Sequence, residues 1–170
     1  MPSDRSRGSH RLGFAAAFAI TFAVSGQHIR EPDRSQAIAI GTIRAITSAE
    51  SAYAAVNGGI FDRLECLAGP SSCVPAAGRE NPFIDRLART TEHGYRFEFF
   101  NGPLARSDAD VPRSKSAMTR FAVVAVPLES QRGQRRAFCA DDRQVIYITA
   151  SGAAPRVADG RCLDATDPLR

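Results

Sequence analysis

Near its middle the chain reads Tyr95-Arg96-Phe97-Glu98-Phe99-Phe100, where aromatic residues alternate with charged ones until position 99. This period of two is typical of a strand with one buried and one solvated face. The tripeptide Asn101-Gly102-Pro103 follows directly and predicts a turn. Residues 119–126 are mostly apolar and β-branched, and they predict a second strand that stops at Pro127. The middle of the chain therefore indicates antiparallel strands joined by turns.

Two more strands are predicted after this pair. Residues 136–140 and 144–149 flank Asp141-Asp142-Arg143, and this arrangement predicts a hairpin. Residues 150–170 are rich in Ala, Gly, Pro and Asp and show no periodicity, so no regular element is expected there. Because consecutive strands with short connections form a meander, the sequence predicts an antiparallel sheet of three or four strands.

A long amphipathic helix is predicted before the strands, from about Asp33 to Val56. Its apolar residues recur at spacings near one helical turn, and they are Ala37, Ile40, Ile43, Ile46, Tyr53 and Val56. Thr47 and Glu50 are assigned to the opposite, polar side, and Asn57-Gly58-Gly59 is expected to end the helix. A second, short helix is expected to begin at Pro82. One long helix covering one face of the sheet makes this an α+β domain.

An apolar run near the N-terminus, Leu12 to Val24, follows a segment that contains Arg5, Arg7 and Arg11. A basic segment, an apolar run and small residues around Ser25 form the pattern of a signal peptide. As a helix the run spans about 20 Å, whereas the hydrocarbon core of a bilayer is about 30 Å thick. Residues 1–25 are therefore interpreted as a signal peptide, with a short N-terminal anchor as the alternative, and residues 26–170 as a single extracytoplasmic domain.

The charge balance argues against nucleic acid as a partner. The 170 residues include 22 basic and 18 acidic ones, which gives a net charge of +4. Removal of residues 1–25 takes away three arginines and one aspartate and leaves 19 basic and 17 acidic residues. No basic patch with interleaved aromatic residues remains. Membrane contact is expected only through the N-terminal segment, if that segment is not cleaved.

All four cysteines follow the predicted cleavage point, and an even number in an exported chain predicts disulfides. Three pairings are open, and the sequence favours Cys66 with Cys73 and Cys139 with Cys162. The first pair closes a short loop, and the second joins the C-terminal part of the chain to the last hairpin. A zinc site is the alternative, but six residues separate Cys66 from Cys73 and no closely spaced Cys or His pair is present.

No motif nominates a catalytic residue, and the chain is not expected to be an enzyme. The sequence lacks a G-x-S-x-G elbow, an H-E-x-x-H pair and a phosphate-binding glycine loop. Asp159, Asp164 and Asp167 lie near Cys162 and are weak candidates for calcium, because hard cations prefer carboxylates on loops. The alternative is a solvated polar segment, and no other cofactor is expected.

Five short segments also occur in a characteristic order. They are Ala39 to Tyr53, Phe61-Asp62-Arg63-Leu64, Phe83 to Ala88, Gly94-Tyr95-Arg96-Phe97, and Arg136 to Asp141 followed by Gln144-Val145-Ile146. Together they resemble the globular part of type IV pilin-like proteins, including the major pseudopilins of type II secretion. The resemblance covers roughly residues 36–155 and implies a pilin-like fold, with one long N-terminal helix packed on a three- to four-stranded antiparallel meander.

The resemblance also implies a function and partners. Pilin-like proteins carry a Gly-Phe processing site, here Gly13-Phe14, and a glutamate at the fifth mature position, where this chain has Phe18. The expected function is that of an exported structural or interaction protein of the bacterial cell envelope, as a minor subunit of a pilus or secretion apparatus. Its expected partners are other pilin-like subunits or envelope proteins. A soluble periplasmic ligand-binding domain or a small hydrolase is the alternative.

Overall fold

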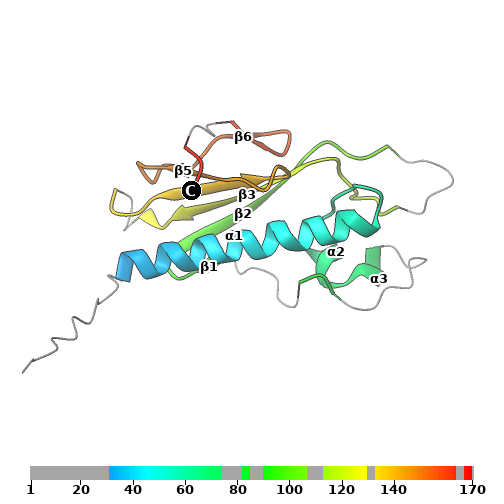
Figure 1. Ribbon diagram of the computed structural model, residues 1–170, viewed down its shortest axis with the longest axis horizontal. Helices are drawn as coiled ribbons and strands as arrows, with labels where there is room; N and C mark the ends of the chain where they lie inside the picture. Colours follow the sequence, from blue (N-terminus) through cyan, green and yellow to red (C-terminus); the bar gives the residue numbers. More distant parts are fainter. Residues whose placement is uncertain are drawn as a thin grey trace, which may run out of the picture.

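The computed structural model describes residues 31–73, 82–84, 90–106, 113–129, 133–163 and 167–169. Helix α1 covers Glu31–Val56, and two short helices follow, α2 (Leu64–Ala68) and α3 (Pro70–Cys73). Figure 1 shows α1 beside the sheet, with α2 and α3 near the later half of α1. Within the described ranges, no helix combines the length and the hydropathy that a membrane crossing requires.

The strands form two antiparallel sheets. The larger sheet has five strands in the order of the chain: β1 (Thr91–Glu92), β2 (Tyr95–Asn101), β3 (Phe121–Pro127), β4 (Ala137–Asp141) and β5 (Ile146–Thr149). The smaller sheet is a ribbon of two short strands, β6 (Val157–Ala158) and β7 (Arg161–Cys162). In the larger sheet β1 and β5 are the outer strands.

The fold class expected from the sequence is wrong. The sheet has five strands instead of three or four, a second sheet is present, and the rest of the described chain is a helix with small pieces. The helix does not cover the sheet along its length: apolar residues from Ala39 to Ile46 share a core with the sheet, whereas Tyr53 packs against Leu67 of α2. A strand of two residues is too short to show a periodic pattern in the sequence. The apolar side of a helix can be predicted from its sequence, but the element that packs against that side cannot. No pilin-like fold is identified.

Strand β3 is buried on both faces, which explains its nearly unbroken apolar sequence. Val123 and Ala125 belong to the core that includes α1. Val124 and Val126 belong to a second cluster on the opposite face, together with Cys139 and Cys162. The sheet is therefore a middle layer, with α1 against part of one face and the β6–β7 ribbon against the other.

The β6–β7 ribbon is held close to the sheet. The Cys139–Cys162 disulfide joins β4 to β7, and the backbone N–H of Cys162 donates to Asp141 Oδ2 at 3.2 Å. At the ribbon turn, Gly160 has a φ of +68°, and a Cβ at this position would lie 2.8 Å from the Cα of Gly102. Only glycine meets both requirements, so the ribbon can approach the two ends of the β2–β3 connection at Gly102 and Arg120.

Several boundaries agree with the sequence analysis. The helix ends at Asn57-Gly58-Gly59, where both glycines have a positive φ and the Gly59 N–H donates to the Ala54 carbonyl at 2.8 Å. The strand predicted at 95–100 lies in β2, and the predicted hairpin comprises β4 and β5. The short helix expected from Pro82 to His93 is wrong at both described ends, because residues 82–84 are not helical and Thr91–Glu92 forms β1. Residues 85–89 lie outside the described residues.

Candidate functional site

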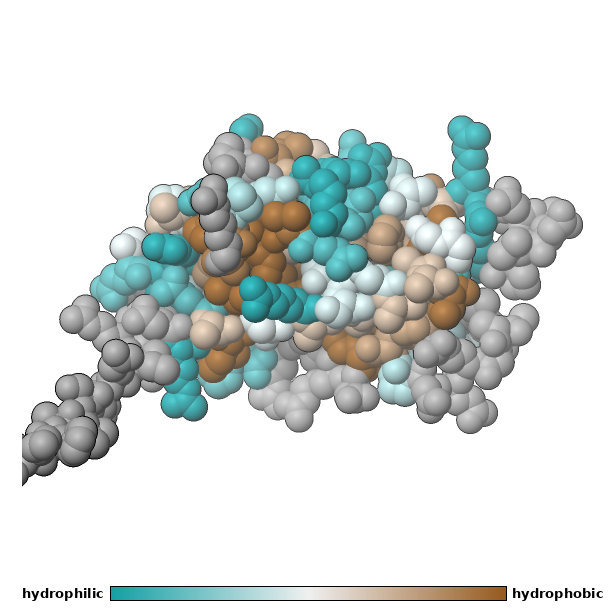
Figure 2. Space-filling model, in the orientation of Figure 1, coloured by the Kyte–Doolittle hydropathy of each residue, from teal (hydrophilic) through white to brown (hydrophobic). Residues whose placement is uncertain are grey.

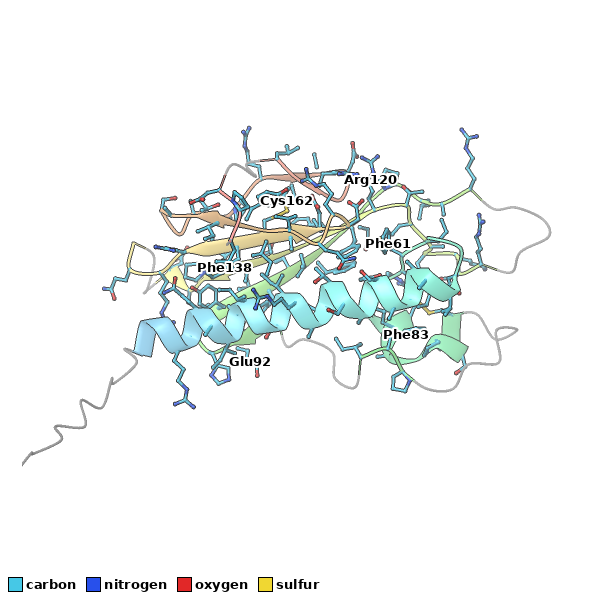
Figure 3. The ribbon with its side chains drawn as sticks, in the orientation of Figure 1. Phe61, Phe83, Glu92, Arg120, Phe138 and Cys162 are labelled. Atoms are coloured by element: carbon cyan, nitrogen blue, oxygen red, sulfur yellow. A yellow bond between two sulfur atoms is a disulfide. The ribbon has the colours of Figure 1, made fainter. Side chains whose placement is uncertain are left out.

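A groove lies between α1 and the β5 edge of the sheet. One wall of the groove is formed by α1. The side chains of this wall are adjacent or three or four residues apart in sequence, so they lie on one side of the helix. They are Gln36, Ala37, Ile40, Arg44 and Thr47. The opposite wall comes from Arg136, which directly precedes β4, from Phe138 of β4 and from Ile146 of β5. Figure 3 shows Phe138 between the sheet and α1, and Figure 2 shows hydrophobic surface above the first half of α1.

Two hollows make up this groove. The larger has a volume of about 480 Å³ and includes Ala37, Ile40 and Phe138 in its lining. The smaller has a volume of about 210 Å³ and includes Val145 and Ile146. Leu169 lines both hollows, and we therefore treat them as two parts of one groove with the Leu169 side chain between them.

The groove is partly filled by three residues, Asp167–Leu169, which we call the edge segment. The segment runs antiparallel to β5, and Pro168 pairs with Tyr147. The N–H of Ile148 donates to the Asp167 carbonyl at 2.9 Å, and the N–H of Leu169 donates to the Ile146 carbonyl at 2.7 Å. The Leu169 side chain is partly buried against the core that α1 shares with the sheet. The segment therefore behaves as a very short additional strand on the open edge of β5.

The charged side chains in the groove lining are basic. Arg136 lines the larger hollow and Arg44 the smaller one, and both residues are exposed. Among the described residues, neither hollow has an aspartate or glutamate in its lining. The rest of the lining mixes apolar side chains with polar ones, among them Gln134 and Gln144. Such a lining with a guanidinium group at each hollow suits a ligand that combines apolar and acidic groups.

A second polar cluster lies at the other end of α1, and it is closed to solvent. Glu50 and Asp62 are both fully buried. Asp62 accepts hydrogen bonds from the Tyr53 hydroxyl at 3.1 Å and from the Ser116 hydroxyl at 2.6 Å. Its backbone N–H donates to Glu50 Oε2 at 3.4 Å. The cluster connects α1, the following connector and the segment before β3, so its role is to hold these parts together.

Glu50 is the least satisfied member of this cluster. Within the described residues, its Oε1 atom is buried and has no hydrogen-bond partner. Burial raises the pKa of Glu50 from 4.5 to about 9, and the nearby charge of Asp62 adds to this rise, while the hydrogen bond from the Asp62 N–H opposes it. Glu50 therefore holds a proton at neutral pH. Burial and the charge of Asp62 also raise the pKa of Tyr53.

A third polar cluster fixes the ribbon. Arg143 donates to both carboxylate oxygens of Asp141, from Nε at 2.9 Å and from Nη2 at 2.6 Å. Burial alone would raise the pKa of Asp141, but the hydrogen bonds from Arg143 and from the Cys162 N–H outweigh it and hold this pKa below its ordinary value. Asp142 pairs with Arg161 of β7 at 3.2 Å. These contacts are structural, since they connect the β4–β5 turn to the ribbon.

The residues that the sequence nominated lie in several places. The cysteines form disulfides Cys66–Cys73 and Cys139–Cys162, the pairing that the sequence favoured. The calcium candidates do not form a described site: Asp159 is exposed in the ribbon turn, Asp167 is exposed in the edge segment, and Asp164 lies outside the described residues. In the part of the chain that the structure describes, no group of three or more Asp, Glu, His or Cys side chains could hold a metal ion.

Comparisons with known proteins give no relative for this chain: no protein-family model matches it, and neither a curated protein nor a solved structure does. The two disulfides nevertheless indicate an oxidising, extracytoplasmic location.

Sequence reasoning missed both the groove and the buried carboxylates. It assigned Thr47 and Glu50 to the polar side of the helix, whereas the structure buries both, with exposed fractions of 6% and 0%. The error has a physical cause: Asp62, which is distant in sequence, supplies a hydrogen bond to Glu50, and the Thr47 hydroxyl donates to the Arg44 carbonyl of its own helix. No sequence signal distinguished Leu169 from Val157 and Leu163, the other large aliphatic residues of the C-terminal stretch.

Proposed function

We propose that this protein is an exported structural or interaction protein of the bacterial cell envelope, and that the groove between α1 and β5 is the surface through which it binds its partner. Within the envelope, we propose that it serves as a minor subunit of a pilus or secretion apparatus. Its partners are then other subunits of that apparatus or other envelope proteins.

One observation carries this proposal: the groove is larger than the three residues that occupy it, and it lies along an edge strand. Two hollows remain beside Leu169, and β5 offers main-chain hydrogen bonds at the same place. Grooves of this kind are suited to protein segments rather than to small molecules, because an edge strand extends the recognition along the chain. Two disulfides support a role outside the cytoplasm.

The buried carboxylates are poorly placed to act as a general acid or base. A general acid or base must lie within hydrogen-bonding reach of its substrate. Glu50 and Asp62 are both fully buried, and the Asp141 carboxylate is occupied by Arg143 and the Cys162 N–H. We therefore assign none of these groups to a reaction.

Fractionation of cells that express the full chain tests the location. We expect the protein in the envelope or periplasmic fraction, with all four cysteines protected from maleimide until a reductant is added. A variant that lacks residues 1–25 is the matched control, and we expect it in the cytoplasm with cysteines that react directly. A full-length chain that stays in the cytoplasm with reactive cysteines would contradict the proposed function.

A further inference from the structure

We propose that the groove binds an extended peptide that pairs with β5 in place of the edge segment, with aliphatic side chains at two alternate positions and acidic side chains beyond them. The inference rests on the proposed function, since it specifies the chemistry of the partner at the same groove. In this mode of recognition, main-chain hydrogen bonds supply affinity, and pockets for alternate side chains supply selectivity.

The backbone part of this recognition is already visible. The edge segment uses the Ile148 N–H and the Ile146 carbonyl of β5, and these groups belong to the outer side of the outermost strand. A peptide strand in the same antiparallel orientation would use the same donor and acceptor. The edge segment thus demonstrates that the groove accepts extended chain with an aliphatic side chain at the position of Leu169.

The register identifies a second aliphatic position. Ile148 pairs with Phe138 across β4 and β5, and its N–H bonds to Asp167. Because alternate residues of a strand face the same side, position 167 faces the same side as Leu169 and lies on the Phe138 side of it. Asp167 itself is exposed. An aliphatic residue at this position would enter the larger hollow, which the edge segment leaves open.

The basic side chains define the ends of the peptide. Arg136 lies at the larger hollow and Arg44 at the smaller one. Both are exposed, and the described lining of the groove holds no acidic side chain that would repel a carboxylate. A peptide with an acidic residue on each side of its aliphatic pair therefore complements the groove better than the edge segment, which has the exposed Asp167 where the peptide would have an aliphatic side chain.

The test uses a synthetic heptapeptide, acetyl-Glu-Thr-Leu-Thr-Leu-Thr-Glu-amide, with the full-length protein, so that both glutamates face the same side as the two leucines. We expect the peptide to bind the wild type, and to bind the Leu169→Ala variant about tenfold more tightly, because the competing side chain has been shortened. Leu163→Ala is the matched control, since Leu163 is an exposed leucine that does not line the groove, and its affinity should equal that of the wild type. Fluorescence anisotropy of the labelled peptide measures each affinity.

A modified peptide measures how much the main-chain hydrogen bond to β5 contributes to the affinity. N-methylation of the second leucine removes the N–H that would donate to the Ile146 carbonyl, and we expect binding to weaken at least about tenfold. Amide NMR shifts should concentrate at Ile146 and Ile148 and leave Thr91, on the opposite edge strand β1, unchanged.

Three results would overturn the inference: no binding to wild type or Leu169→Ala at millimolar peptide, equal binding of the N-methylated peptide, or shifts concentrated at β1. Each leaves the proposed envelope location standing, because fractionation tests the location separately. If the protein binds the peptide but remains in the cytoplasm, the result would support the peptide-binding groove and contradict the proposed envelope function.

Discussion

Replacing Glu50 by glutamine will stabilise the protein at neutral pH and reduce the dependence of its stability on pH. The raised pKa of about 9 in the folded state exceeds the ordinary value of 4.5, so the folded protein binds one more proton than the unfolded chain between these values. The stability that this proton contributes is complete below about pH 4.5 and is lost as pH rises towards 9, by about 1.4 kcal/mol for each pH unit. A glutamine stays neutral and avoids this loss.

At pH 7.5 the expected gain is on the order of 4 kcal/mol, whereas at pH 5 the two proteins should differ by less than about 1 kcal/mol. Urea unfolding at both pH values measures the difference. Glu65→Gln is the control, because Glu65 is exposed in α2, and it should change little at either pH. A Glu50→Gln protein that is less stable than wild type at pH 7.5, or that loses stability with pH in parallel to it, would contradict the buried-proton account.

Removal of the Cys139–Cys162 disulfide will destabilise the protein more than removal of Cys66–Cys73. The two disulfides have sequence separations of 23 and 7 residues, and the longer loop constrains the unfolded chain more strongly. The loop-entropy relation gives roughly 3 kcal/mol for the long loop and about 2 kcal/mol for the short one. The longer bridge also fixes the ribbon against β4, where both of its cysteines are buried.

The comparison uses the double variants Cys139→Ala/Cys162→Ala and Cys66→Ala/Cys73→Ala, unfolded in urea without reductant. The short-loop variant is the matched control for the loss of two sulfur atoms. Equal midpoints for the two variants, or a lower midpoint for the short-loop variant, would contradict this account of the ribbon.

Local signals in the sequence located most of the elements but not their assembly. Alternation in residues 95–100 and the flanking turn predicted β2, and Asn57-Gly58-Gly59 predicted the end of α1. These features depend on neighbours along the chain. By contrast, β1, β6 and β7 have two residues each, which is too short for a period, and their pairing partners alone define them.

The candidate site could not be predicted from the sequence for a related reason. The groove brings together the first half of α1, the β5 edge and Leu169, which are separated by more than a hundred residues from one end to the other. Ile40 appeared only as part of a core stripe, yet it lines the larger hollow. Likewise, the sequence predicted a solvent-exposed Glu50, because its buried surroundings include Asp62 and the segment before β3, which are distant in sequence.

Photo-crosslinking in intact cells tests most directly whether the groove is a partner-binding surface outside the cytoplasm. A benzoylphenylalanine at position 40 would lie in the larger hollow, and one at position 104 serves as the control, because Leu104 is 68% exposed and does not line the groove. We predict a cross-link from position 40 to an extended segment of an envelope protein, mapped by mass spectrometry and suppressed by the heptapeptide. Cross-links from position 40 that reach only residues 167–169 of the same chain, or equal partner yields from positions 40 and 104, would contradict this claim.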